Sequence, residues 1–231
     1  MYNYPDFSPN LYDYKHKTGL RPGEKVPDVA VQSPDGEIIP LKKLFDHVTV
    51  LETGSLTCPL YIGKIKSMNT LAKKHKNINF AVVYIREAHP GNRLCAVDSD
   101  SLKRARAQSL TRYEAENRKI YVDTLDGALH HALGLLPNMV YVIDTDGAVL
   151  HRSDWNNPDR LDHILMAIEN GQKFPAWCEE FEPVPVKTTL RVLFRAGGIR
   201  AVADFLSHLP AMIREKRRID EKDPAQNPLH C

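Results

Sequence analysis

The segment Val48–Pro59, VTVLETGSLTCP, is the most informative part of the chain. It joins a β-rich run to a Gly-Ser turn and then to a cysteine followed directly by proline. A strand that enters a helix through such a turn places Cys58 at or near the first helical residue, and Pro59 where a first turn tolerates proline. Unpaired backbone N–H groups and the helix dipole favour a thiolate there. We therefore predict a reactive cysteine, with a buried, inert cysteine as the alternative.

Strands and helices alternate on both sides of this segment. Before it, the turn signal Ser33-Pro34-Asp35-Gly36 predicts a β-hairpin, and Leu41–Asp46 predicts a short helical turn. The elements predicted after it are a helix over Leu60–Lys76, a strand over Ile78–Ile85, a helix from Asp98–Ser101 to Asn117, a strand over Ile120–Asp123, a short helix closed by Gly134, strands over Met139–Ile143 and Ala148–Arg152, and a helix from Asn157 to about Gly171.

This order predicts an α/β fold with a central mixed β-sheet flanked by helices. A nucleophilic cysteine at the first β-to-α junction and Pro137 opening a later strand are together typical of the thioredoxin-like fold. In that fold the proline is cis and lies against the active-site sulfur. We therefore predict a cis bond at Leu136–Pro137 and a substrate-binding role for Pro137.

Three parts are predicted along the chain. Residues 1–24 are rich in Tyr, Pro and Asn and form an N-terminal arm anchored by its tyrosines, residues 25–173 form the thioredoxin-like domain, and residues 174–231 form a C-terminal helical extension with a mobile tail. The extension contains two helices broken near Gly197-Gly198. Its apolar stripe should pack on the core or in a homodimer, or else lie on a membrane surface. The stripe consists of Ile199, Val202, Phe205, Leu206 and Leu209.

Composition restricts the class of protein. The 231 residues are 42% hydrophobic, enough for a core, and the net charge of +2 gives no basic field, so no nucleic-acid partner is predicted. No apolar run is long enough to span a membrane, and the first residues lack the apolar core of a secretion signal. Cysteines at 58, 95, 178 and 231 form no CxxC pair, which indicates individual thiols in the cytoplasm. His130-His131 lacks a second ligand pair, so no metal is expected.

Two motifs carry a resemblance to a known family. GSLTCP at 54–59 and VVYIREAHPGN at 82–92 resemble the iodothyronine deiodinases, which have a Gly-Ser-x-Thr-selenocysteine-Pro loop and a Tyr-Ile-x-Glu-Ala-His strand end. The resemblance implies that Cys58 stands in the place of the selenocysteine. It also implies that Ser55 and Thr57 line the loop, and that the site includes Tyr84, Glu87 and His89.

The chain departs from the family pattern at several positions. Cysteine replaces selenocysteine, and Leu56 stands where members often have a second cysteine. Glu52 and Thr53 replace the apolar and Asn residues that usually precede the Gly-Ser turn. We also expect no N-terminal membrane anchor of the vertebrate kind. Thyroid hormone is therefore a poor default substrate.

The site residues have chemical roles and plainer alternatives. A neutral His89 could donate or accept a proton near Cys58, and Glu87 could fix its tautomer. Alternatively, His89 caps a loop, Glu87 is a solvated strand-end charge, and Tyr84 belongs to the core. The hydroxyl groups of Ser55 and Thr57 would be within reach of a thiolate, although both residues also suit a simple turn.

Three functions compete at this stage. The first is a deiodinase-like thiol oxidoreductase that acts on a small electrophilic substrate and is regenerated by an external thiol or thioredoxin-type reductant, without a cofactor. The second is a peroxiredoxin-like peroxidase, although Leu51 and Ser55 stand where that loop needs Pro and Thr. The third is a non-catalytic thioredoxin-fold binding module. Cys95 and Cys231 are the candidate internal resolving thiols.

Overall fold

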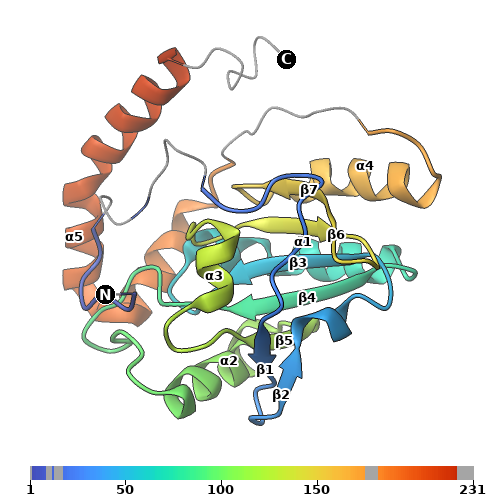
Figure 1. Ribbon diagram of the computed structural model, residues 1–231. Helices are drawn as coiled ribbons and strands as arrows, with labels where there is room; N and C mark the ends of the chain where they lie inside the picture. The colour runs from blue at the N-terminus through green and yellow to red at the C-terminus, as the bar shows by residue number, and fades with distance from the viewer. Residues whose placement is uncertain (1, 9–11, 13–17, 175–181, 223–231) are drawn as a thin grey trace.

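The computed structural model describes residues 2–8, 12, 18–174 and 182–222 (Figure 1). The strands in this part of the chain are β1 (Ala30–Gln32), β2 (Ile38–Pro40), β3 (Thr49–Gly54), β4 (Asn79–Tyr84), β5 (Lys119–Val122), β6 (Val140–Ile143) and β7 (Val149–Ser153). The helices are the 3-10 turn η2 (Leu41–Leu44), α1 (Pro59–Lys74), α2 (Asp100–Glu114), α3 (Ala128–Leu133), α4 (Pro158–Glu169) and α5 (Val186–Lys222). Each predicted element is present, with ends shifted by a few residues.

The described strands form one mixed sheet in the order β2-β1-β5-β4-β3-β6-β7. The central pairs β3–β4 and β4–β5 are parallel, and β6 runs antiparallel to β3. The hairpin strand β1 joins the sheet through the antiparallel pair Gln32–Val122. Two parallel β-α-β crossovers followed by an antiparallel hairpin and a helix make this a thioredoxin-like fold, as the sequence predicts.

Alternation along the central strands divides the core between the two faces of the sheet. On β4, Phe80 and Val82 face the side of α1, α2 and α4, whereas Ala81 and Val83 face α3 and the N-terminal arm. Both faces are covered, which explains why β3, β4 and β6 are buried almost throughout. The segment from residue 18 to β1 passes α3, where Leu20 N donates to Ala132 O, and crosses in front of the sheet (Figure 1).

Helix starts follow the capping residues of the sequence. Cys58 is the N-cap of α1, and Pro59 is its first helical residue. The side chain of Ser99 accepts a hydrogen bond from Leu102 N at the start of α2, and that of Asn157 accepts one from Arg160 N at the start of α4. The predicted position of Cys58 at a helix N-terminus is therefore confirmed.

The predicted cis bond at Leu136–Pro137 is wrong, because this bond is trans. The chain reverses before β6 through left-handed backbone at Gly134 (φ 106°) and Leu135 (φ 66°). Pro137 lies in the following turn, before the first residue of β6. Its missing N–H costs no ladder bond, because the pairing with β3 begins at Met139, whose N–H donates to Thr53 Oγ1 and whose carbonyl accepts from Thr53 N.

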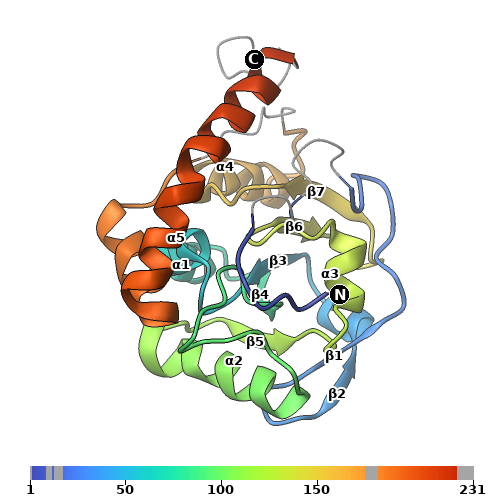
Figure 2. The same cartoon turned by 90° about the vertical axis from the view of Figure 1, so that its left-hand side faces the viewer.

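Helix α5 is bent where the sequence predicts a break. Gly197 and Gly198 have non-helical backbone, and the loop after β4 packs into the bend. A Cβ on Gly91 would lie 2.7 Å from Ala196 O, so only glycine permits this approach. Figure 2 shows the later part of α5 rising away from the sheet.

The apolar stripe on α5 is only partly buried in the chain itself, with Val202, Phe205 and Leu209 partly covered and the other two residues exposed. Ile199 is 76% exposed and Leu206 is 52% exposed, whereas Phe205 packs against the rings of Phe7 and His89. Among the described residues, no helix is both long and apolar enough to cross a membrane.

Candidate functional site

The parallel pairing of β3 and β4 brings the two motifs together. Gly54 pairs with Tyr84, and Ile85 N donates to Gly54 O at 3.1 Å, so the loop that ends at Cys58 runs beside the segment after β4. The Tyr61 ring packs directly over Gly54, where an added Cβ would lie 2.4 Å from it. The glycine of the first motif therefore allows α1 to approach the strand end closely.

Ser55 and Thr57 join these two segments. Ser55 Oγ accepts from Ala88 N at 3.2 Å, and Thr57 Oγ1 accepts from His89 N at 3.1 Å. Both hydroxyl groups are fully buried. They therefore fix the Cys58 loop against the strand end, rather than serving as simple turn residues.

Glu87 is the polar centre of this site. Its carboxylate accepts hydrogen bonds from Thr57 Oγ1 at 2.7 Å, Tyr84 OH at 2.5 Å and Arg106 Nη1 at 2.9 Å, while its side chain is almost fully buried. Tyr84 OH also accepts from Leu56 N at 3.3 Å. Thr57, Tyr84 and Glu87 are thus connected by hydrogen bonds, and Ser55 joins the same segment through Ala88 N. Glu87 is buried and not a solvated strand-end charge, whereas Tyr84 does belong to the core, with its hydroxyl group bonded to Glu87.

Cys58 itself is buried, and its predicted thiolate character is wrong for this structure. Only 1% of the residue is exposed, and its neighbours in the apolar cluster include Tyr61, Ala88 and Val192. Burial raises the pKa of Cys58 to about 12, although the backbone amides of Tyr61 and Leu60 oppose the increase. Desolvation therefore outweighs the favourable helix N-terminus.

His89 lies at the site but is not oriented by Glu87 as predicted. Its ring packs between Phe7 and Phe205, and among the described residues its Nδ1 has no hydrogen-bond partner. Burial lowers the pKa of His89 to about 3, so the imidazole is neutral at pH 7. Glu87 is directed instead at Thr57, Tyr84 and Arg106.

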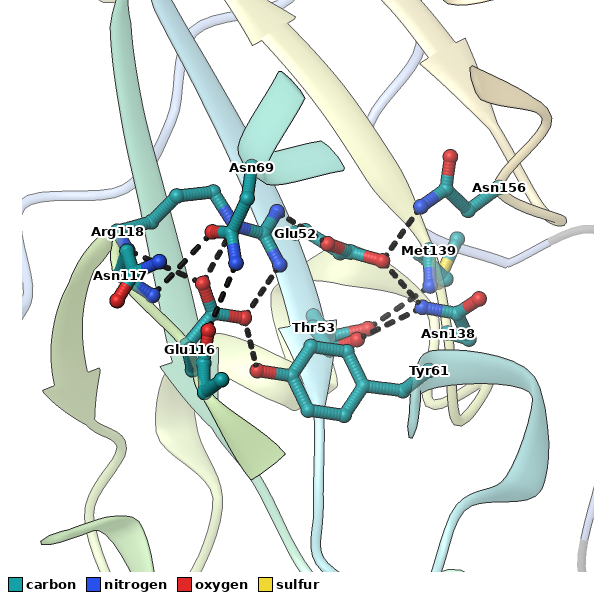
Figure 3. A network of polar contacts seen from close by, with 11 residues as sticks. Glu52, Thr53, Tyr61, Asn69, Glu116, Asn117, Arg118, Asn138, Met139 and Asn156 are labelled. Carbon is teal, nitrogen blue, oxygen red and sulfur yellow. Dashed lines mark hydrogen bonds and ion pairs between the residues drawn. The ribbon is translucent and has the colours of Figure 1, made fainter. Parts of the chain in front are cut away.

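A second polar network lies between α1 and the sheet, on the face of the sheet that α1 covers (Figure 3). Glu52, at the centre of β3, pairs with Arg118 Nη1 at 2.5 Å, and Arg118 also donates to both oxygens of Glu116. Tyr61 OH donates to Glu116 Oε2 at 2.7 Å. Two carboxylates thus share one guanidinium away from water, and one of them, Glu116, also accepts from a phenol.

The same network reaches toward the other edge of the sheet. Glu52 Oε1 accepts from the amide groups of Asn138 at 2.8 Å and Asn156 at 2.5 Å. Lys64 Nζ donates to Asn156 O and pairs with Glu182 at 3.6 Å. Burial is the main cause of the high pKa of Cys58. The negative charge of Glu52 raises this pKa further, and the positive charge of Lys64 lowers it. Glu52, a departure from the family pattern, is therefore part of the electrostatic environment of the thiol.

Sequence reasoning missed several residues of the site. Arg106 comes from α2. The only sequence feature that could have indicated it is its position next to Ala107, which is buried. Arg195 Nη2 donates to Leu56 O at 2.6 Å, and Phe7 and Phe205 cover His89. The last three belong to the arm and to α5, and nothing in their local sequence indicates these contacts.

The remaining predicted residues lie as follows. Cys95 is exposed with a free thiol, and Arg106 contacts both its carbonyl oxygen and, at 3.6 Å, its Sγ. Cys231 lies outside the described residues. Pro137 is buried, and its role remains a prediction. Within the described residues, no group of His, Cys, Asp or Glu is arranged to hold a metal ion.

Comparison with solved structures supports the fold. An uncharacterized conserved protein from Geobacillus kaustophilus superimposes with a TM-score of 0.53 at 13% identity, covering 71% of this chain and 94% of its own. A hypothetical protein from Sinorhizobium meliloti also gives 0.53, at 10% identity, covering 67% and 87%. At these identities the likeness concerns the fold alone.

Sequence comparison gives the family. Thyroxine 5-deiodinase of Gallus gallus is 33% identical over 106 residues, covering 42% of this chain and 41% of the relative. Thyroxine 5-deiodinase of Rattus norvegicus is 26% identical over 144 residues, covering 56% and 46%. The chain thus spans less than half the length of these relatives. The family model of iodothyronine deiodinase matches residues 10–156, which include both motifs and most of the sheet, and the chain therefore belongs to the iodothyronine deiodinase family.

Proposed function

We propose that this chain is a thiol-dependent reductive dehalogenase in which Cys58 attacks a halogen, such as iodine, on an activated aromatic ring. The observation that carries the proposal is the position of Cys58 at the N-terminus of α1, in a loop bonded through Thr57 to the buried Glu87. The thiol is the softest nucleophile among these described residues, and the hydroxyl groups of Ser55 and Thr57 fix its loop. Positioning of this kind is what a direct attack on a bound substrate requires.

The reaction balances with an external thiol as the reductant. Cys58 loses its proton and attacks iodine, the carbon–iodine bond breaks, the ring carbon takes up one proton, and a sulfenyl iodide forms on Cys58. A first reductant thiol displaces iodide and forms a mixed disulfide with Cys58. A second reductant thiol then releases Cys58 as a thiol and leaves with the first as a disulfide. The net change is one aryl iodide and two thiols giving arene, hydrogen iodide and disulfide.

His89 and Glu87 support the dehalogenase over the peroxidase. A peroxidase needs a free cationic group beside the sulfur, whereas Arg106 is paired with Glu87 and Arg195 with Glu114. Within the described residues, the Nδ1 of His89 has no hydrogen-bond partner, so the neutral imidazole can supply the proton that the ring carbon takes up. The free thiols of Cys58 and Cys95 accord with a reducing compartment, which we propose to be the cytoplasm.

The test measures two activities in each variant. Reduction of an iodinated phenol with dithiothreitol, and oxidation of Cys58 by hydrogen peroxide, are followed in wild type, Cys58→Ser and His89→Ala. We expect Cys58→Ser to abolish both, and His89→Ala to lower dehalogenation by about 10²–10⁴-fold while changing peroxide oxidation only a few-fold. His151→Ala is the matched control, since His151 is also largely buried against one ring, that of Phe174, but lies on β7. Fast peroxide turnover without dehalogenation would replace this proposal by the peroxidase.

A further inference from the structure

Three aromatic rings meet at the mouth of the site. The ring of Phe7 lies 4.1 Å from that of His89, centroid to centroid, at an interplanar angle of 35°. Phe205 contacts the same imidazole from another side, at 5.6 Å and 77°. Phe7 is 8% exposed. A residue of the N-terminal arm thus occupies the face of His89 on which a planar ligand would stack.

The arm also covers the backbone between Glu87 and His89. Tyr12 OH and Tyr4 OH lie 3.2 and 3.4 Å from Ala88 O, and the N–H of the same residue is held by Ser55 Oγ. Burial raises the pKa of Tyr4, and the charges of Cys58 and Glu87 contribute to the increase, so this phenol is close to both groups. On the other side, Val192 of α5 packs in the same cluster as Cys58. Cys58 is only 1% exposed: Tyr61, Ala88 and Val192 pack in its cluster, and the arm lies over Ala88 as the next layer.

Arg86 holds the arm through its aromatic rings. Its guanidinium lies 5.1, 4.8 and 5.5 Å from the ring centroids of Tyr2, Tyr4 and Tyr12, and its Nη1 donates to Tyr2 O at 3.0 Å. Tyr4, Phe7 and Tyr12 also belong to the apolar cluster on the α3 side of the sheet, so apolar packing and cation–π contacts together hold the arm in place.

Two buried polar atoms under the arm lack partners. Within the described residues, neither Arg86 Nε nor His89 Nδ1 makes a hydrogen bond, although both are shielded from solvent. Buried polar groups in a permanently closed contact are almost always paired. The aromatic rings of the arm cover these two atoms but offer them no hydrogen bond. This points to a second state in which a ligand or a water molecule forms the missing hydrogen bonds.

We propose that the described part of the N-terminal arm, residues 2–8 and Tyr12, is an intramolecular cover of the Cys58 site, in which Phe7 takes the place of a planar aromatic ligand on His89 and must leave before the thiol reacts. The identity of the ligand rests on the proposed function, whereas closure of the thiol does not. Movement of the arm away from the site would expose Cys58 and His89 to water, and the pKa of each group would return toward its ordinary value. The closed chain thereby holds its thiol in an unreactive form.

The first experiment measures how fast iodoacetamide alkylates Cys58 at pH 8, by peptide mapping of the full chain. We expect Phe7→Ala to react about tenfold faster than wild type, the change that about 1.4 kcal/mol off the opening free energy gives, with Phe7→Leu in between. Phe174→Ala, which removes a ring from His151 on β7, should leave the rate unchanged. Equal rates in wild type and Phe7→Leu, with both folded by circular dichroism, would overturn the proposal. Phe7→Leu keeps the test valid if Phe7→Ala unfolds.

The second experiment tests the aromatic ligand with 2-naphthol as the probe. A ligand that must displace Phe7 binds more weakly than one that meets an open site. We therefore expect 2-naphthol to bind Phe7→Ala about tenfold more tightly than wild type and to protect its Cys58 from alkylation. Faster alkylation without tighter binding would refute Phe7 as a ligand mimic. These readouts involve no dehalogenation, so failure of the proposed reaction would leave them unaffected.

Discussion

The Glu52 network and the Glu87 site are both buried clusters built on a glutamate and an arginine, but they are closed in different ways. Arg118 pairs with Glu52 and Glu116 beneath α1, between strands and the loops that directly flank them (Figure 3). Glu87 lies just beyond the end of β4, where it is bonded to Thr57 in the Cys58 loop and to Arg106 of α2, with Tyr4 of the arm nearby. The first cluster is enclosed within the sheet, whereas the second lies at a strand end next to the loop that carries the thiol, the place in a fold where chemistry is usually found.

The largest effect should come from breaking the first cluster. Arg118→Met leaves Glu52 and Glu116 buried without their common counter-charge, and removal of one partner from such a pair costs about 3–5 kcal/mol. Urea unfolding followed by circular dichroism measures this loss. Arg191→Met, at an arginine half exposed on α5, is the control and should cost less than about 1 kcal/mol. Equal losses in the two variants would show that the Glu52 network is not a stabilising centre.

The second effect is a pH dependence at Cys58. Because burial raises the pKa of this thiol to about 12, the thiolate fraction should still be increasing at pH 10. We expect the alkylation rate of Cys58 in wild type to rise about tenfold per pH unit from pH 8 to pH 10, since only the thiolate reacts. The exposed Cys95 provides an internal reference in the same digest. A plateau below pH 9 would mean that the thiol is hydrated and that the second cluster is open in solution.

The smallest effect gives the sharpest comparison, because the same substitution can be made in both clusters. Tyr61→Phe and Tyr84→Phe each remove a phenol that donates to a buried glutamate, so each should cost about 1.5–3 kcal/mol of stability. Only Tyr84 also holds Leu56 N in the loop before Cys58. We therefore expect dehalogenation to fall about tenfold further in Tyr84→Phe than in Tyr61→Phe, measured under conditions where both are folded. Identical activities in the two variants would show that the hydrogen bond between Tyr84 and Leu56 N does not contribute to the reaction.

The fold could be predicted from the sequence because each element carries its own local signal. The buried runs of β4 and β6, Pro59 behind Cys58, and the capping side chain of Asn157 determine element type and ends without long-range information. The exception was Pro137, where a superfamily pattern suggested a cis bond but Gly134 and Leu135 already make the turn.

The site was only partly predictable. Thr57 and Glu87 could be placed together because parallel strands end at the same edge of a sheet, and their hydrogen bond of 2.7 Å agrees. The state of Cys58 could not be predicted, because its burial depends on residues such as Val192, which comes from a segment distant in sequence. For the same reason, the sequence analysis expected Glu87 to hydrogen-bond to His89, whereas in the structure Glu87 accepts a hydrogen bond from Arg106 of α2.

The cover contributed by α5 has a consequence for the synthesis of the protein. Val192 and Phe205 are translated long after Cys58, and at about 5–20 residues per second the interval is on the order of ten seconds. During that interval the strands that follow Cys58 are synthesised, while the segment of α5 that packs in the cluster of the thiol does not yet exist. Cys58 therefore acquires this part of its apolar surroundings only near the end of synthesis, after the arm and the strands of the sheet.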